Sequence, residues 1–274
     1  MRFAICNETY QDWSLADICA DVAAAGYDAL EIAPFTLRMP VEELTEADAR
    51  EAGRIARDAG LAVSGLHWLL AKTEGMSLTS PDKQVRQRTV DHVRRLANAC
   101  AAMGGHVMVW GSPKQRGVAE NESYQQAQAN AAEVLSAICE TARPLGVTVA
   151  LEPLPRSETD FLTTASETRE LIDRVNDPAC RLHLDVKAMC DETTPIPTLI
   201  ANHADLLSHF HANDPNLRGP GQGEVDFRPI FKALREAGYG GDVSVEVFDY
   251  TPDGPTIARE SLNYLRKIES EVLV

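Results

Sequence analysis

Four short apolar runs along the chain each stop at a side chain that can bind a metal ion. The runs VAL, LHL, HF and VSV are followed directly by Glu152, Asp185, His211 and Glu246. Three carboxylates and one imidazole form an oxygen-rich donor set, which suits Mn²⁺, Mg²⁺ or Co²⁺ better than a structural zinc site built from thiolates. The four residues therefore predict one divalent metal site, provided that the fold brings the ends of the runs together.

Each of these residues taken alone has a simpler explanation. A single acid at the end of a strand often caps the next helix, and a single histidine on a strand is more often a satisfied polar group of the core. Four such residues in successive units are hard to explain in this way. Three acids buried together without a cation would also be destabilised by mutual repulsion and by the loss of water. A metal site is therefore the favoured interpretation.

The elements that would position these side chains follow a repeated order of short β-rich runs and longer helical patterns. We expect strands at residues 3–6, 29–32, 61–67, 106–110, 148–152, 181–185, 208–211 and 242–247. We expect helices at residues 14–26, 45–60, 82–103, 124–146, 166–176, 196–203, 229–237 and 255–268. Ser14 and Thr45 are the expected N-caps of the first two helices, and Ser80-Pro81 supplies the start signal of the third.

Eight strand–helix units in about 250 residues are typical of an α/β fold, a single (β/α)8 TIM barrel, here spanning residues 1–274 as one domain. A doubly wound open sheet is the main alternative. It would usually have fewer strands and a glycine-rich phosphate loop after the first strand, and the sequence has no such loop. In a TIM barrel the carboxyl ends of neighbouring strands surround one mouth, so side chains that end the fifth to eighth strands can converge there.

Composition narrows the class of partner. Acidic residues outnumber basic residues by 41 to 26, which gives a formal charge of −15 and disfavours nucleic acid and anionic membranes as partners. The six cysteines are scattered without a CxxC pair, as expected of reduced thiols in the cytosol. No apolar run reaches the roughly 20 residues of a membrane helix, and the N-terminus lacks a signal-peptide layout. We therefore expect a cytoplasmic protein with a small-molecule partner.

Four segments of the chain resemble those of a known family. The segments LEPLPRSETDFL, RLHLDVKAM, HFHANDPNLRGPGQGEVDF and VSVEVF are similar to those of the xylose-isomerase-like TIM-barrel superfamily, the sugar phosphate isomerases and epimerases. Within it, the pattern resembles ketose 3-epimerases and hydroxypyruvate isomerase. The resemblance spans nearly the whole chain. It implies that Glu152, Asp185, His211 and Glu246 bind one divalent metal, with Mn²⁺ expected and Mg²⁺, Co²⁺ or Zn²⁺ as alternatives.

The resemblance also implies an activity, that of a metal-dependent sugar isomerase or epimerase on a carbohydrate substrate. Glu152 and Glu246 would act as an acid/base pair on a metal-stabilised enediolate, and Arg218 and Glu158 would contact the substrate. His67 could line the pocket. Trp13, Trp110 and Phe248 could wall the apolar face of a sugar, although ordinary core or rim positions explain these aromatic residues equally well.

The sequence departs from the epimerase pattern beside Asp185. Ketose epimerases carry a histidine at the position of Ala188, and here Lys187 precedes that position and could replace the missing sugar contact. With Lys114, Arg116 and Arg156 in neighbouring loops, Lys187 could bind an acidic or phosphorylated sugar. A solubilising role for the loop charges is the alternative.

Three other functions remain open on the sequence. A metal-dependent dehydratase or lyase for keto-sugars or inosose would need the same enediolate, and only product analysis would separate it from an isomerase. An endonuclease IV-like DNA repair enzyme would need more histidines and is disfavoured by the negative charge. A non-catalytic binding barrel would not need two glutamates as an acid/base pair. A homo-oligomer is compatible with the sequence, which shows no interface.

Overall fold

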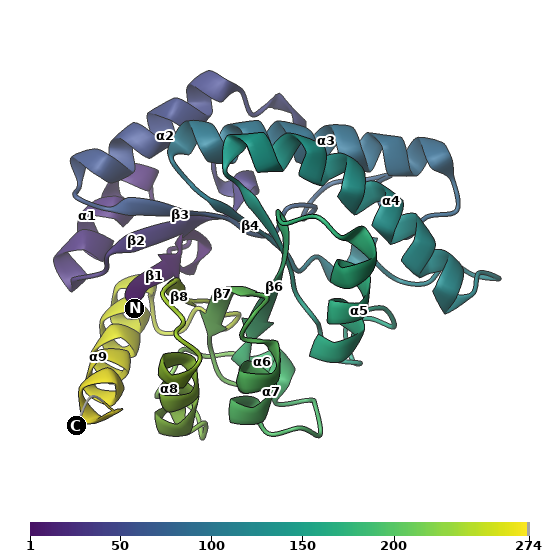
Figure 1. The fold of residues 1–274 in the computed structure, drawn as a ribbon. Coiled ribbons are helices and arrows are strands. Elements are labelled where there is room, and N and C mark those ends of the chain that lie inside the picture. The colour runs from purple at the N-terminus through teal and green to yellow at the C-terminus, as the bar shows by residue number, and fades with distance from the viewer. Residues whose placement is uncertain (273–274) are drawn as a thin grey trace.

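The computed structural model describes residues 1–272 as a closed barrel of parallel strands in the order β1 to β8, with β8 paired to β1 (Figure 1). The strands are β1 Arg2–Cys6, β2 Ala29–Ile32, β3 Ala62–Leu66, β4 Val107–Trp110, β5 Thr148–Leu151, β6 Cys180–Asp185, β7 Leu207–Ala212 and β8 Asp242–Val245. The expectation of a (β/α)8 TIM barrel is confirmed.

Helices surround the barrel on the outside, and α9 brings the C-terminal part of the chain back beside α1 and α8 (Figure 1). The helices are α1 Leu15–Ala25, α2 Glu46–Asp58, α3 Lys83–Met103, α4 Tyr124–Ala142, α5 Ala165–Val175, α6 Val186–Met189, α7 Ile196–His203, α8 Phe227–Glu236 and α9 Gly254–Val272. No helix among residues 1–272 is long and apolar enough to cross a membrane.

The helix starts follow from capping side chains. Ser14 accepts a hydrogen bond from the amide of Asp17, and Thr45 forms a reciprocal capping box with Asp48, so both expected caps are confirmed. The expected cap of the third long helix, Ser80, was wrong by two residues, and the helix begins at Lys83 and not at Asp82. Asp82 caps α3 by accepting from the amide of Gln84, because a carboxylate directly before the helix lies closer to its first free amides than Ser80 does.

The main apolar core lies between the barrel and the helices, where Phe3 of β1 stacks on Phe231 of α8 with ring centroids 6.2 Å apart. The inside of the barrel is polar by comparison. Ser64 of β3 donates to Asp242 of β8 at 2.6 Å, and His209 of β7 contacts Glu31 of β2 at 2.9 Å. Contacts between strands that are not neighbours can form only across the barrel interior, so a polar layer fills its centre.

Candidate active site

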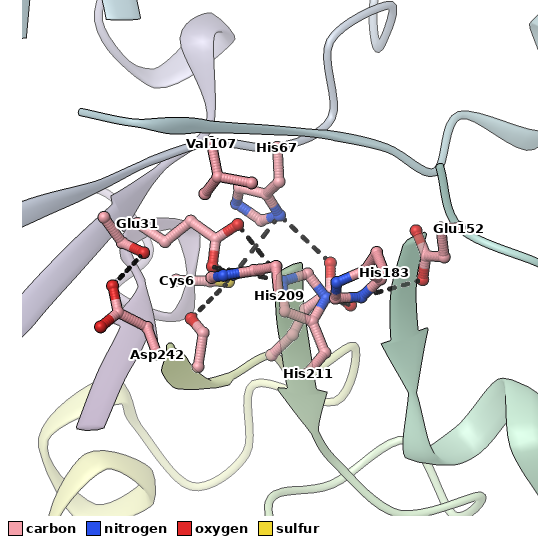
Figure 2. A network of polar contacts seen from close by, with 12 residues as sticks. Cys6, Glu31, His67, Val107, Glu152, His183, His209, His211 and Asp242 are labelled. Carbon is pink, nitrogen blue, oxygen red and sulfur yellow. Dashed lines mark hydrogen bonds and ion pairs between the residues drawn. The ribbon is translucent and has the colours of Figure 1, made fainter. Parts of the chain in front are cut away.

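The structure brings three of the four predicted metal ligands together at the carboxyl ends of the strands. Glu152 directly follows β5, Asp185 ends β6, and His211 lies near the end of β7. One donor atom from each of these residues and one from His183 all lie within 4.8 Å of one another, and all four residues are buried. Figure 2 shows Glu152, His183 and His211 converging from different strands.

Glu246, the fourth predicted ligand, directly follows β8 and joins this group through His211. Its Oε2 atom lies 3.1 Å from Nδ1 of His211, and its Oε1 atom lies 3.2 Å from Nδ1 of His67. Glu246 is therefore adjacent to the donor group and held in a fixed orientation. Its role as a ligand remains a prediction.

Local structure fixes the orientation of Asp185. This residue is also the N-cap of α6, and its Oδ1 atom accepts from the amide of Ala188 at 2.7 Å. Its Oδ2 atom accepts from Nδ2 of Asn213 at 2.5 Å, while Oδ1 of Asn213 accepts from the amide of Lys187 at 2.8 Å. A strand end that is at once a helix start thus aims this carboxylate at the barrel mouth.

Glu152 has no comparable support. Among the described residues, no hydrogen bond reaches its side-chain oxygens, and the nearest imidazole nitrogen, Nε2 of His183, is 3.9 Å away. Gly111 makes room for it, since a Cβ atom at that glycine would overlap Oε2 of Glu152. A buried carboxylate without a donor is destabilised unless it takes up a proton or a cation.

His183 is also unsatisfied. It is fully buried, and within the part of the chain that the structure describes neither of its ring nitrogens has a hydrogen-bond partner. Its ring packs edge-on against His211 with centroids 4.1 Å apart. Because buried polar atoms normally find partners, an imidazole in this state points to an ion or water as its missing partner.

Three carboxylates and three imidazoles alternate in one continuous series of contacts across the barrel. The series runs Glu8–His67–Glu246–His211–Glu31–His209, with contact distances of 2.9, 3.2, 3.1, 3.2 and 2.9 Å. In Figure 2, His67, His209 and His211 lie between Glu31 on one side and Glu152 on the other. Each imidazole between two carboxylates offers a nitrogen to each of them, so the series fixes ring orientation throughout.

Burial and neighbouring charges give the carboxyl groups of the mouth different pKa values. Burial and the charges of Asp185 and Glu246 raise the pKa of Glu152 to about 8. Burial and the charge of Glu246 likewise raise the pKa of Asp185 to about 6. Burial also opposes ionisation of Glu246, but His211 and His67 outweigh it and hold the pKa of Glu246 at about 2. Glu152 and Glu246 therefore favour opposite protonation states at neutral pH.

A small cavity at the strand ends, here called the mouth cavity, connects these groups with several predicted substrate contacts. It is lined by His67, Trp68, Val109, Gly111, Glu152, Leu154, Glu158, Lys187, Glu246 and Phe248. Lys187 Nζ lies 2.5 Å from Oε1 of Glu158 and 4.4 Å from the ring centroid of Phe248. The structure thus gathers Glu158, Lys187, His67 and Phe248 around the two glutamates.

The other predicted substrate contacts lie elsewhere. Arg218 is more than a third exposed, and its Nε atom contacts Oδ2 of Asp249 at 3.2 Å. Trp110 is fully buried. Trp13 is 46% exposed and lines a second cavity beside Glu8. None of the three is among the residues that line the mouth cavity.

The loop cations do not form a shared anion site at the mouth. Arg116 is fully buried and donates to the backbone carbonyls of Glu152 and Trp110, which makes it a structural residue. Lys114 and Arg156 are exposed and do not line the mouth cavity. Of the four cations considered from the sequence, only Lys187 reaches the cavity.

Sequence reasoning did not place five residues in the site, namely Glu8, Glu31, Gly111, His183 and His209. Two signals were present. Glu31 lies one residue before the end of an expected strand, and His209 and His211 are two residues apart, so they share one face of β7. Nothing in the local sequence identifies Glu8, because its contact with His67 joins loops that are 59 positions apart.

The fold and these strand-end residues define a family. The model described as "Xylose isomerase-like TIM barrel" matches residues 19–268, and the chain belongs to this family, as the sequence resemblance implied.

Relatives within this group are named as epimerases. The chain is 28% identical to L-ribulose 3-epimerase from Methylomonas sp. (strain DH-1), over 86% of this chain and 80% of that protein. It is 27% identical to D-psicose 3-epimerase from Enterocloster bolteae, over 87% and 78%. A crystal structure of a D-psicose 3-epimerase in the presence of D-fructose superposes with a TM-score of 0.86 at 22% identity, covering 98% of this chain and 99% of that one. Epimerases are isomerase-class enzymes, so the expectation of an isomerase-type enzyme is confirmed at that level.

Proposed function

We propose that this protein is a divalent-metal-dependent epimerase or isomerase of ketose sugars that moves a proton at the carbon beside the sugar carbonyl. The carrying observation is that Glu152 and Glu246 line one small cavity from different walls of the barrel, after β5 and β8. The names of the relatives support a ketose as the substrate.

The residues present fit a divalent cation. Among the described residues, the Glu152 carboxylate accepts no hydrogen bond and both ring nitrogens of His183 lack a partner. Asp185 and His211 converge on the same point. We propose that Glu152, Asp185, His211 and Glu246 hold the ion, with His183 available as a further nitrogen donor. Because carboxylates dominate the set, Mn²⁺ is the expected ion. A cation there would polarise the substrate carbonyl and offset the negative charge that develops on proton removal.

The side chains then have separate tasks. Two carboxylates face the substrate from two sides. That of Glu246 is held by His67 and His211, and that of Glu152 accepts no hydrogen bond among the described residues. One removes the proton and the other returns one. Return from the opposite face inverts the carbon, and return to the neighbouring carbon exchanges aldose and ketose. Lys187 and Glu158 offer a donor and an acceptor to substrate hydroxyls, and Phe248 supplies an apolar surface.

The substrate that fits this cavity is not phosphorylated. A phosphate group carries a charge close to −2 and needs several cations or backbone amides to hold it. Lys187 is the sole Lys or Arg side chain among the residues lining the mouth cavity, and Glu158 already neutralises it. An uncharged ketose meets the polar groups of the cavity without this cost.

Solvent exchange tests the reaction directly. The protein with Mn²⁺ is incubated in D₂O with D-fructose, D-allulose, L-ribulose and D-fructose 6-phosphate, and deuterium at the carbon beside the carbonyl is followed by NMR. We expect exchange into an unphosphorylated ketose. Glu152→Gln and Glu246→Gln should each lower its rate by about 10²–10⁴-fold, the usual contribution of a positioned acid or base.

Glu224→Gln is the matched control, because Glu224 is an exposed acid of the loop after β7 and does not line the cavity. It should exchange at the wild-type rate. Equal rates in Glu152→Gln and Glu224→Gln would contradict the assignment of the acid/base pair. Exchange confined to the phosphorylated sugar would contradict the proposed substrate class.

A further inference from the structure

A second cavity of about 270 Å³ opens at the same end of the barrel as the mouth cavity. The loops that follow β1, β2 and β3 build it, together with the start of α1. Its lining residues are Asn7, Glu8, Tyr10, Gln11, Asp12, Trp13, Leu15, Ile18, Phe35, Thr36, Leu37 and Lys72. We call it the Trp13 cavity.

The imidazole of His67 and the carboxylate of Glu8 lie in contact between the Trp13 cavity and the mouth cavity. His67 lines the mouth cavity, and its Nε2 atom lies 2.9 Å from Oε2 of Glu8, which lines the Trp13 cavity. On the other side of the same ring, Nδ1 of His67 lies 3.2 Å from Oε1 of Glu246. A molecule with one part beside Glu246 and another beside Glu8 would therefore span a short distance.

The Trp13 cavity is lined by a residue with an unsatisfied polar atom, Glu8. Glu8 is 4% exposed, and its Oε1 atom has no hydrogen-bond partner among the described residues. Leaving a buried carboxylate oxygen without a donor is costly, so its position on a cavity wall points to a donor that arrives with a ligand.

The rest of the lining combines aromatic rings with hydrogen-bonding groups. Trp13 holds its indole in solvent and packs edge-on against Tyr10, with ring centroids 5.5 Å apart. Gln11, Asp12 and Lys72 are exposed around it. An aromatic face beside amide, carboxylate and ammonium groups matches a ligand with an apolar ring face and a rim of hydroxyls. Two carboxylates beside a single lysine disfavour an anion.

We infer that the Trp13 cavity binds a second sugar unit, attached to the ketose that reacts in the mouth cavity. The preferred substrate class is then a glycosylated ketose, and free monosaccharides bind more weakly. This inference rests on the proposed function. It adds that Glu8 accepts a hydroxyl of the second unit and that Trp13 packs against its ring face.

Calorimetry on the full chain loaded with Mn²⁺ tests the inference without requiring turnover. The probes are D-fructose and two disaccharides in which it carries a second sugar. These are lactulose (galactosylated at O4) and isomaltulose (glucosylated at O6). At least one disaccharide should bind on the order of tenfold more tightly than D-fructose, the equivalent of about 1.4 kcal/mol. Trp13→Ala should remove most of this ratio.

Leu145→Ala is the control, because Leu145 is an exposed apolar residue before β5, at the opposite end of the barrel. It should keep the wild-type ratio. The inference is overturned if neither disaccharide binds more tightly than D-fructose, or if Trp13→Ala leaves the ratio unchanged. A crystal soaked with the tighter disaccharide should place its second ring beside Trp13, and a ring placed elsewhere would also overturn it.

Deuterium exchange separates this inference from the proposed reaction. Exchange into D-fructose without a disaccharide preference would leave the reaction standing and remove the second subsite. A disaccharide preference that depends on Trp13, without exchange into any of the three sugars, would support the subsite and contradict the reaction.

Discussion

Two polar regions lie one above the other in this barrel, and they differ in how far their charges are paired. The lower one is the interior layer, made of Glu31, Ser64, His209 and Asp242. The upper one is the mouth, made of Glu152, Asp185 and Glu246. Both are buried, and both contain carboxylates at the centre of the fold.

In the interior layer every carboxylate has strong partners. Glu31 contacts both His209 and His211, and these imidazoles overcome the effect of burial and hold the pKa of Glu31 well below its usual value. Asp242 accepts from Arg2 at 2.7 Å and from Ser64 at 2.6 Å. Such pairing stabilises a fixed arrangement and leaves little capacity for a ligand.

In the mouth, the carboxylate of Glu152 lacks such partners. Its pKa is raised because burial and the neighbouring carboxylates disfavour its charged form. Buried polarity alone therefore does not identify the working site of this protein, because the interior layer is equally polar. The carboxylate of Glu152, which accepts no hydrogen bond among residues 1–272, and the ring nitrogens of His183, which have no partner there, mark the place where a cation and a substrate would complete the structure.

The largest expected effect on stability comes from breaking the interior layer. His209→Leu removes one of the two imidazoles from Glu31 and should lower the free energy of unfolding by about 3 kcal/mol, as loss of a partner from a buried charge does. At pH 5, where Glu152 is protonated in the metal-free protein, Glu152→Gln should change it by less than about 1 kcal/mol, since an uncharged amide replaces an uncharged carboxyl group. Urea unfolding measures both.

The double variant Glu31→Leu/His209→Leu is the control for the interior layer. It removes the charge together with its partner and should recover part of the loss. Equal destabilisation by His209→Leu and Glu152→Gln would show that the two regions do not differ as described.

Removal of the metal ion tests the mouth separately from the interior layer. Mn²⁺ at 100 times its dissociation constant should stabilise the folded protein by about 2.7 kcal/mol relative to protein treated with EDTA. The gain should be lost in Glu152→Gln and kept in Glu224→Gln, as measured by thermal unfolding with and without the ion. A full gain in Glu152→Gln would remove this residue from the metal site.

The smallest expected effect is on the pH dependence of the metal-free protein. Glu152 stays protonated in the folded state up to about pH 8, whereas in the unfolded state it ionises near 4.5. Its contribution to stability is therefore present below pH 4.5 and is lost as the pH rises to about 8. The contribution of Glu31 to stability depends on pH in the opposite sense, since it is lost only as the pH falls below about 4.5.

Between pH 5 and 8 the two regions can thus be separated. Glu152→Gln should reduce the fall in stability across this window by at least about 1.4 kcal/mol, the equivalent of one pKa unit. Urea unfolding at pH 5, 6.5 and 8 measures it. An equal change in stability across this range in wild type and in Glu152→Gln would contradict the unpaired state of Glu152.

The sequence by itself determined the barrel and the strand ends that carry its chemistry. Parallel strands alternate with helices, each apolar run is short, and a residue at the end of a run must lie at the mouth once the barrel closes. For this reason Glu152, Asp185, His211 and Glu246 could be placed near one another without coordinates. Capping residues such as Thr45 were equally visible, because a cap depends on neighbours within one helical turn.

Only the tertiary structure decided which polar groups are paired and which are free. His67 lies between Glu8 and Glu246, and Arg116 turns inward to backbone carbonyls, through contacts between segments far apart in the chain. The same holds for Gly111, which leaves room for Glu152, and for Trp13, which lines a second cavity. Strand periodicity determines on which face of the sheet a side chain lies. Its contacts depend on how distant loops pack over the barrel.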